Sequence, residues 1–412
     1  MRFFILVCML TSLAHAQDPG GDDAMGRAIA LLRTTPLIDG HNDLPWMVRE
    51  VADGDFSRFD LKTTLVGDTN IPRLRAGQVG AQFWSVWIPP ELGGEGYARM
   101  QLEQIELVHR MIETYPETFQ LALTADDIEQ AYAAGRIASL IGMEGGYGLE
   151  NSLGALRAYF RLGVRYMTLA HWNTLDWADS ATDEARHDGL NAFGVEVVRE
   201  MNRLGVLVDL AHVSAATMHD ALDHSRAPVI FSHSLAYALV NHPRNVPDEV
   251  LRRLPENGGI IMASFVPEYL SSEVNEWARG FGARLPDGHY TTAEYDRIRH
   301  QYMKENGAVL AGLSDVADHL DHLRKVAGPD HIGIGSDFWG SDDLPTGLED
   351  ASKFPALFAE LIRRGWSDED LKKLAGQNML RVMRKAEAVA RDLQESTAPS
   401  MMRIDQQPGR RR

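Results

Sequence analysis

The sequence predicts an α/β protein folded as a (β/α)8 barrel of the TIM type, and three observations support this fold. Eight short apolar segments recur along the 412 residues, and helical patterns such as 193–204 and 309–326 lie between them. Most of these segments are continuous runs of Val, Ile, Leu and Met, which are typical of parallel strands covered on both faces. Six of the eight end in an ionisable residue. Repeated β-then-α units favour a closed barrel over an open sheet.

The predicted strands leave room for a crossover helix between neighbours. They cover residues 36–43, 80–88, 137–144, 164–171, 205–212, 227–233, 258–265 and 331–337. The longest insertion covers residues 266–306, between the seventh strand and its helix. Because loops that follow barrel strands lie on the catalytic face, we expect this insertion to form a lid or a pocket wall.

The chain divides into a signal peptide at 1–16, a single barrel domain at 17–395 and a flexible tail at 396–412. One charge at Arg2, an apolar run over 3–13 and the sequence Ala14-His15-Ala16 are typical of a cleaved signal peptide. No later stretch approaches the roughly 20 apolar residues of a transmembrane helix. We therefore expect a secreted protein, periplasmic or extracellular, without a stable membrane anchor after cleavage.

The cysteine content and the net charge exclude several kinds of metal ligand, nucleophile and binding partner. Cys8 is the single cysteine and lies in the predicted signal peptide. The mature chain therefore has no disulfide, thiolate metal ligand or cysteine nucleophile, so any metal must be held by imidazole and carboxylate groups. The net charge is −17, without a basic stripe, which argues against a nucleic-acid partner.

The ionisable residues at the strand ends predict a metal centre, because a barrel gathers these ends around one mouth. His41 and Asp43 end the first strand, and the period of two places both on one side. A lone His-x-Asp is more often a turn or capping feature, but the strand-end position favours metal ligands. Glu144 can bridge two cations, and neutral His212 and His233 are suitable zinc ligands.

Other histidines do not lie at the carboxyl end of a predicted strand and are not expected to bind metal. His319 and His322 have helical spacing in a predicted outer helix, where we expect a solvated face. His331 begins the eighth strand and is expected at the opposite face of the barrel.

Seven motifs resemble those of the membrane dipeptidase (renal dipeptidase) family, as a secreted bacterial-type member. They are Leu37-Ile38-Asp39-Gly40-His41-Asn42-Asp43-Leu44-Pro45, Gln82-Phe83-Trp84-Ser85-Val86, Met143-Glu144-Gly145-Gly146, Val208-Asp209-Leu210-Ala211-His212-Val213-Ser214, Phe231-Ser232-His233-Ser234, His242-Pro243-Arg244-Asn245 and His331-Ile332-Gly333-Ile334-Gly335-Ser336-Asp337-Phe338. The resemblance runs in one order from about 35 to 382. It departs from the family at Trp339, where an acid is common, and around Trp172 and 263–265.

The resemblance implies a barrel of the metal-dependent hydrolase type and a zinc-dependent dipeptidase. His41, Asp43 and Glu144 would bind one Zn²⁺, and Glu144, His212 and His233 would bind a second. Glu144 and a water or hydroxide would bridge the two ions of each chain, and Glu144 is thereby also a catalytic residue. The resemblance also implies substrate roles for His171, Arg244 and Asp337.

The expected reaction is hydrolysis of small dipeptides through the bridging hydroxide. His171 would donate a hydrogen bond to the developing oxyanion, and Asp337 would carry a proton from the water to the leaving amine. Arg244 would pair with the C-terminal carboxylate through its guanidinium fork. Two alternatives remain open: another binuclear metal amidohydrolase acting on N-acyl amino acids or lactams, and an inactive binding barrel. The oligomeric state, a homodimer included, is also open.

We expect the mature protein to begin at Gln17, because Ala14-His15-Ala16 has the small residues of a signal-peptide cleavage site. Mass spectrometry of protein from the native host measures this terminus. An intact Met1 form as the sole species, confined to the cytoplasm, would contradict the predicted signal peptide.

Overall fold

The computed structural model describes residues 20–92, 96–286 and 292–406. The predicted signal peptide at 1–16 lies outside these residues. Residues 397–406 follow the last long helix, and Ser400 in this segment donates from Oγ to Glu196 at 2.9 Å. The division into a domain and a flexible tail stays a prediction. Among the helices of the described residues, none is both long and apolar enough to cross a membrane.

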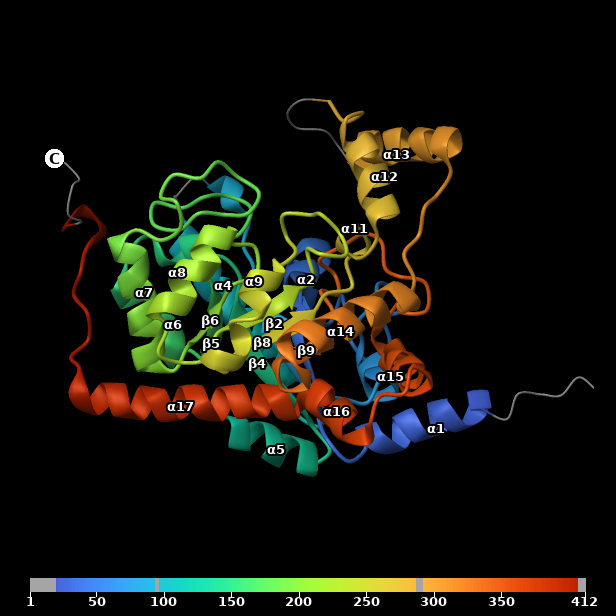
Figure 1. Cartoon of the computed structure of the whole chain (residues 1–412), viewed down its shortest axis with the longest axis horizontal. Helices are drawn as coiled ribbons and strands as arrows, with labels where there is room; N and C mark the ends of the chain where they lie inside the picture. Colours follow the sequence, from blue (N-terminus) through green and yellow to red (C-terminus); the bar gives the residue numbers. More distant parts are fainter. Residues whose placement is uncertain (1–19, 93–95, 287–291, 407–412) are drawn as a thin grey trace, which may run out of the picture.

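Eight parallel strands close into a barrel, which confirms the predicted (β/α)8 fold (Figure 1). They are β1 (Leu37–Asn42), β2 (Val79–Ser85), β4 (Ile137–Met143), β5 (Val164–Thr168), β6 (Leu207–Asp209), β7 (Ile230–Ser234), β8 (Ile260–Ala263) and β9 (Ile332–Ile334). Neighbours follow the order β2-β1-β9-β8-β7-β6-β5-β4, and pairing of β2 with β4 closes the ring. Each strand falls within a predicted segment or within one residue of it.

A ninth strand, β3 (Phe119–Leu121), was not predicted from the sequence. It pairs with the first residues of β4, through Phe119 beside Ile137 and Leu121 beside Ser139. Strand β5 joins β4 only from Ile141 onward. The short β3 therefore extends the sheet at the amino end of β4, and its three residues are too few to give a periodic signal.

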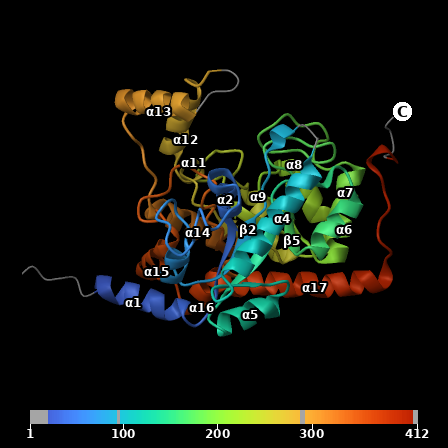
Figure 2. The same cartoon turned by 180° about the vertical axis from the view of Figure 1, so that it is seen from behind.

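Helices surround the barrel and close its amino end. They are α1 (Gly20–Leu32), α2 (Leu44–Ala52), α3 (Ile71–Ala76), α4 (Tyr97–Thr114), α5 (Ala125–Ala133), α6 (Leu153–Arg161), α7 (Ala192–Leu204), α8 (Ala215–His224), α9 (Asp248–Leu251), α10 (Leu254–Asn257), α11 (Pro267–Leu270), α12 (Ser272–Gly282), α13 (Thr292–Asn306), α14 (Leu313–Ala327), α15 (Phe354–Arg363), α16 (Asp368–Lys372) and α17 (Asn378–Ser396). In Figures 1 and 2, α5 and α17 run side by side beneath the barrel.

The barrel interior is a packed core that continues into the helices below it. Phe83, Leu140, Tyr166 and Met262 belong to one buried cluster, which also includes side chains of α5 and α17 such as Met379. This cluster fills the amino end of the barrel, so an open mouth is left only where the strands end.

The insertion at 266–306 lies on the side of this mouth, and its described part forms α11, α12 and α13. Both views show α12 and α13 standing clear of the barrel, on the side opposite α17 (Figures 1 and 2). This position is the one expected for a lid or a pocket wall.

One expectation about the outer histidines is wrong. His319 in α14 is only 1% exposed, not solvated. The backbone N–H of Ala236 donates to its Nδ1 at 3.2 Å, and its Nε2 lies 3.3 Å from the carbonyl oxygen of Leu270. Because this histidine joins α14 to the loop after β7 and to the end of α11, it has a structural role. His322 is half-buried and pairs with Asp248 at 2.8 Å.

A glycine allows two strand ends to approach closely beneath the site. A Cβ added at Gly335 would overlap the carbonyl oxygen of Ser232, which is backbone and cannot rotate away. We expect Gly335→Ala to lower the free energy of unfolding by about 1–3 kcal/mol. Urea unfolding measures the change. The control is Gly26→Ala, in exposed helix with no atom within 4 Å, which should raise stability by about 0.5–1 kcal/mol. If Gly335→Ala were as stable as the wild type, the close approach of Gly335 to the Ser232 carbonyl would be contradicted.

Candidate metal centre

The eight residues singled out in the sequence meet at the carboxyl ends of the strands. They are His41 on β1, Asp43 after β1, Glu144 after β4, His171 after β5, His212 after β6, His233 on β7, Arg244 in the loop after β7, and Asp337 after β9. Each is at most 9% exposed. The mouth therefore holds a cluster of buried ionisable groups, which proteins rarely form without charged or metal partners.

Glu144 stands at the centre of this cluster, and its two oxygens face different partners. Oε2 lies 3.4 Å from Nε2 of His41. Oε1 lies 3.0 Å from Nε2 of His212 and 3.4 Å from Nε2 of His233. A carboxylate placed in this way can give one oxygen to each of two cations.

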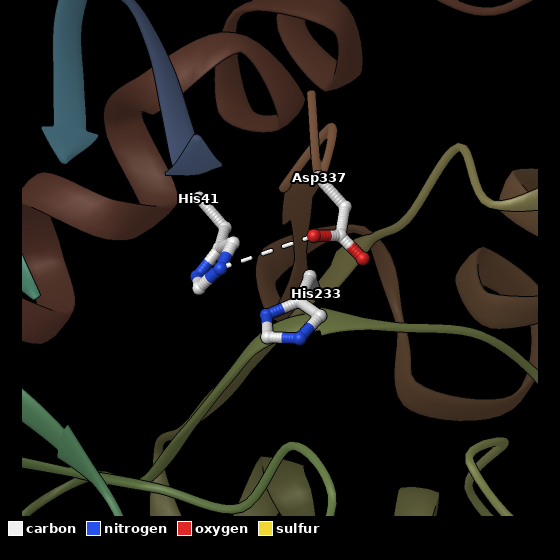
Figure 3. A group of neighbouring side chains, drawn as sticks. All are labelled: His41, His233 and Asp337. Atoms are coloured by element: carbon white, nitrogen blue, oxygen red, sulfur yellow. Dashed lines mark ion pairs between the residues drawn. The ribbon is translucent and has the colours of Figure 1, made fainter. Parts of the chain in front are cut away.

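Two groups of three side chains match the sets implied by the sequence resemblance: His41, Asp43 and Glu144, and Glu144, His212 and His233. Within each group the candidate ligand atoms lie within 4.8 Å of one another. A third group joins His41, His233 and Asp337, whose side chains point toward one another in Figure 3. The donors are imidazole and carboxylate groups throughout, which suit zinc.

The unpaired atoms of these side chains also fit a cation. Nε2 of His41 and Oδ1 of Asp43 are buried without a hydrogen-bond partner among the described residues. Nε2 of His212 and Nε2 of His233 are 2.9 Å apart. Burial lowers the pKa of both His212 and His233 well below the ordinary value, so both rings are neutral and have lone pairs free for a metal.

Hydroxyl groups of Ser232 and Tyr166 fix which ring nitrogen of two histidines, His233 and His41, carries the proton. Ser232 donates from Oγ to Asp209 at 2.7 Å and lies 2.8 Å from Nδ1 of His233. Its oxygen therefore accepts from Nδ1–H, and Nε2 of His233 keeps its lone pair. The Tyr166 hydroxyl lies 2.8 Å from Nδ1 of His41 and donates to the Gly40 carbonyl at 3.3 Å, with the same result for His41.

A second buried acid ties the turn that contains Asp337 to β1. Asp39 accepts from the backbone N–H of Ser336 and from its Oγ, each at 2.7 Å. Burial raises the pKa of Asp39 to about 6, and the bonds from Ser336 oppose this shift. The sequence reasoning did not assign functions to Asp39 or Asp209. Their signal was an acid within an otherwise apolar strand, whereas Tyr166 gave no signal.

The backbone is strained where two of the site residues leave their strands. His212 has φ 68° and Asp337 has φ 64°, in the left-handed region that non-glycine residues rarely adopt. Such strain gathers at functional sites, where the surrounding structure holds it in place. The backbone N–H of Asp337 donates to the His41 carbonyl at 3.2 Å, which helps to fix this turn.

The ring of His171 is a neutral hydrogen-bond donor toward the cluster. The indole of Trp87 donates from Nε1 to Nδ1 of His171 at 3.5 Å, so the proton of the neutral ring is on Nε2. That Nε2 lies 3.6 Å from Oε1 of Glu144. Burial, together with the charge of Arg244, lowers the pKa of His171 well below the ordinary value. Sequence reasoning placed His171 but did not find Trp87.

Arg244 is buried with most of its fork unpaired. It is 1% exposed, and Nη2 donates to the His233 carbonyl at 3.2 Å. Its Nε and Nη1 have no hydrogen-bond partner among the described residues. The ring of Tyr269 lies 5.3 Å from the guanidinium carbon. A buried guanidinium with two unpaired donors is suited to an anionic group that arrives with a ligand.

Asp337 is the third carboxylate of the mouth. Its Oδ1 lies 3.9 Å from Nε2 of His41. Burial raises the pKa of Asp337 to about 7, and the neighbouring carboxylates of Asp43 and Glu144 add to this shift. A carboxyl group with a pKa near neutrality can both take up and release a proton.

Comparison with known proteins identifies the family that carries this arrangement. The family model described as membrane dipeptidase (peptidase family M19) matches residues 25–397. Dipeptidase 3 of Rattus norvegicus is 40% identical over 368 residues, which are 88% of this chain and 67% of that protein. Dipeptidase verJ of Clonostachys rogersoniana is 38% identical over 386 residues, or 91% and 90% of the two chains.

Solved structures agree with this assignment. The probable dipeptidase PvdM from Pseudomonas aeruginosa has a TM-score of 0.77 and 25% identity, over 90% of this chain and all of that chain. The metallopeptidase dipeptidase AC shares the fold, with a TM-score of 0.72, 24% identity, and coverage of 86% and 99% of the two chains. The chain therefore belongs to the membrane dipeptidase family, peptidase family M19, and is a dipeptidase.

Proposed function

We propose that this enzyme uses two zinc ions to hydrolyse dipeptides that carry a free C-terminal carboxylate. The observation that carries the proposal is the pairing, in one buried mouth, of a bridging carboxylate with an unpaired guanidinium. Glu144 divides its oxygens between two ligand groups, and Arg244 offers two free donors beside them. The first feature suits a binuclear metal site, and the second suits the end of a short peptide.

His41, Asp43 and Glu144 would hold one zinc ion, and Glu144, His212 and His233 the other. Zinc bound in such sites lowers the pKa of water and polarises a carbonyl group, so no side-chain nucleophile is needed. The tautomers set by Ser232 and Tyr166 leave the Nε2 lone pairs of His233 and His41 available for binding.

Arg244 would bind the C-terminal carboxylate of the substrate. In a dipeptide this group lies one residue beyond the scissile carbonyl, within reach of a fixed guanidinium. A longer peptide places an uncharged amide there and leaves the buried donors without an anion. Since a hydrogen bond to a charged group contributes about 1.5–3 kcal/mol, Arg244 would make the enzyme select for substrate length.

His171 and Asp337 would act on the peptide bond itself. The Nε2–H of His171 would donate to the carbonyl oxygen as negative charge develops on it. Asp337 would accept a proton from the attacking water and return it to the leaving amine, a role that suits a buried carboxyl group with a pKa of about 7.

The site of action is proposed to be outside the cytoplasm. The support is the sequence of residues 1–16, with its single charge, apolar run and Ala14-His15-Ala16. A cysteine-free mature chain is compatible with export, since no thiol is exposed to oxidation.

Replacing the bridging carboxylate should remove both metals. Glu144→Gln keeps the side-chain volume but removes the charge, so we expect fewer than one zinc per chain instead of two. The value of kcat/KM should fall more than about a hundredfold. Elemental analysis and dipeptide assays measure these effects. The matched control is Glu200→Gln, a buried acid paired with Arg157 at 2.9 Å, which should keep both metals. Two bound zinc ions and normal turnover in Glu144→Gln would exclude Glu144 as the bridge.

Removing the guanidinium should abolish selection for a free carboxylate. The wild type should cleave a dipeptide at least about tenfold better than its C-terminal amide, which corresponds to about 1.4 kcal/mol. Arg244→Ala should erase most of this difference by weakening dipeptide turnover. Values of kcat/KM for both substrates test this. The control is Arg381→Ala, at the closed end of the barrel, where Nη1 donates to the Gly258 carbonyl at 2.6 Å. An unchanged preference in Arg244→Ala would remove Arg244 from the substrate site.

A further inference from the structure

A cavity of about 380 Å³ lies beside the metal centre. Its walls come from Trp172, from α11, α12 and α13, from the segment 308–311 and from the turn 339–344 after β9. The insertion that was expected to form a lid or a pocket wall therefore contributes one side of this space. A volume of this size lies within the range of ligand-binding pockets.

Three aromatic residues connect the cavity with the catalytic mouth. The ring of Trp172 lies 4.9 Å from the ring of His171. The ring of Tyr269 lies 5.3 Å from the guanidinium carbon of Arg244. Trp339, the third aromatic wall, follows Asp337 by two residues. The cavity therefore shares its walls with residues that contact or adjoin the groups of the mouth.

The indole of Trp339 packs against the backbone of Gly67, where no larger residue would leave room for it. Gly67 has φ +75°, and a Cβ added there would overlap the indole of Trp339. The backbone N–H of Trp339 donates to Oδ2 of Asp68 at 2.8 Å, which fixes the turn. The indole therefore rests directly on glycine backbone and presents an aromatic surface to the cavity.

The remaining lining is apolar inside and acidic at the rim. Trp277 and Val274 line the α12 side. At the rim, Asp343 pairs with Arg299 at 2.5 Å, while Glu268 and Asp342 are further carboxylates that line the same space. The described lining thus has three carboxylates and one guanidinium, so the cavity disfavours an anionic group and suits a large uncharged one.

The depth of Arg244 orients the substrate relative to this cavity. Arg244 is 1% exposed, whereas Trp172 is 42% exposed at the outer side of the mouth. With its C-terminal carboxylate on Arg244, a dipeptide has its N-terminal residue nearer the opening. We propose that the cavity binds the side chain of the N-terminal residue and selects large aromatic side chains. This inference rests on the proposed function, because it assumes that Arg244 holds the carboxylate.

The test fills the cavity without touching the catalytic groups. Ala278 on α12 lines the space, so Ala278→Phe should block it. Ala283 caps the same helix outside the lining, and Ala283→Phe is the matched control. Values of kcat/KM are measured for Phe-Ala, Ala-Phe, Ala-Ala, Glu-Ala and Lys-Ala in the zinc-loaded enzyme.

The wild type should prefer Phe-Ala over Ala-Ala and over Glu-Ala by at least about tenfold. Ala278→Phe should lower turnover of Phe-Ala at least tenfold and change Ala-Ala less than about twofold. Retained Ala-Ala turnover also shows that the variant is folded and loaded. Ala283→Phe should behave as the wild type.

Three results would overturn the assignment. Equal turnover of Phe-Ala and Ala-Ala would show that the cavity selects nothing. A loss confined to Ala-Phe in Ala278→Phe would place the C-terminal side chain there instead. A preference for Lys-Ala over Phe-Ala would assign selection to the rim carboxylates rather than to the rings. Absence of turnover with every dipeptide would instead count against the proposed function.

Discussion

The buried carboxylate of Glu144 is the constraint on which the rest of the site depends. Burial raises the pKa of Glu144, because moving its charge out of water is costly. Asp43 and Asp337 add two more carboxylates, and Arg244 is the one permanently charged cation among the eight site residues. Neutral His212 and His233 cannot balance this negative charge. A divalent cation could, so binding of one here would stabilise the folded mouth.

The same hydrogen bonds close the barrel and orient the ligands. Asp39 on β1 holds Ser336 beyond the end of β9, and Asp209 on β6 holds Ser232 on β7. Each of these two Asp–Ser pairs, called clamps below, joins neighbouring strands at the level of the candidate metal centre. One clamp contacts the ring of His233 through Ser232, and the other fixes the turn of Asp337. Both acids are fully buried, and small movements between these strands would displace the candidate ligands His233 and Asp337.

The sequence was sufficient for the barrel and for placing Glu144 and the other strand-end residues, because barrel geometry brings all strand ends to one mouth whatever the spacing along the chain. It was not sufficient for contacts that depend on side-chain direction. Tyr166 reaches His41 across the barrel interior, and Trp87, after β2, reaches His171 past the end of β4. Helical spacing likewise could not show that His319 faces a loop instead of solvent.

The turn after β9 contains both Asp337, which lies in the mouth, and Trp339, whose side chain lines the cavity. Asp337 and Trp339 both have left-handed φ, 64° and 65°, and backbone N–H groups anchor both: one on the His41 carbonyl, the other on Asp68. The indole of Trp339 makes no hydrogen bond within the described residues. Its identity can therefore change the cavity wall while the backbone keeps Asp337 in place. In the proposed mechanism, binding of the side chain and proton transfer by Asp337 would then depend on different residues of one turn.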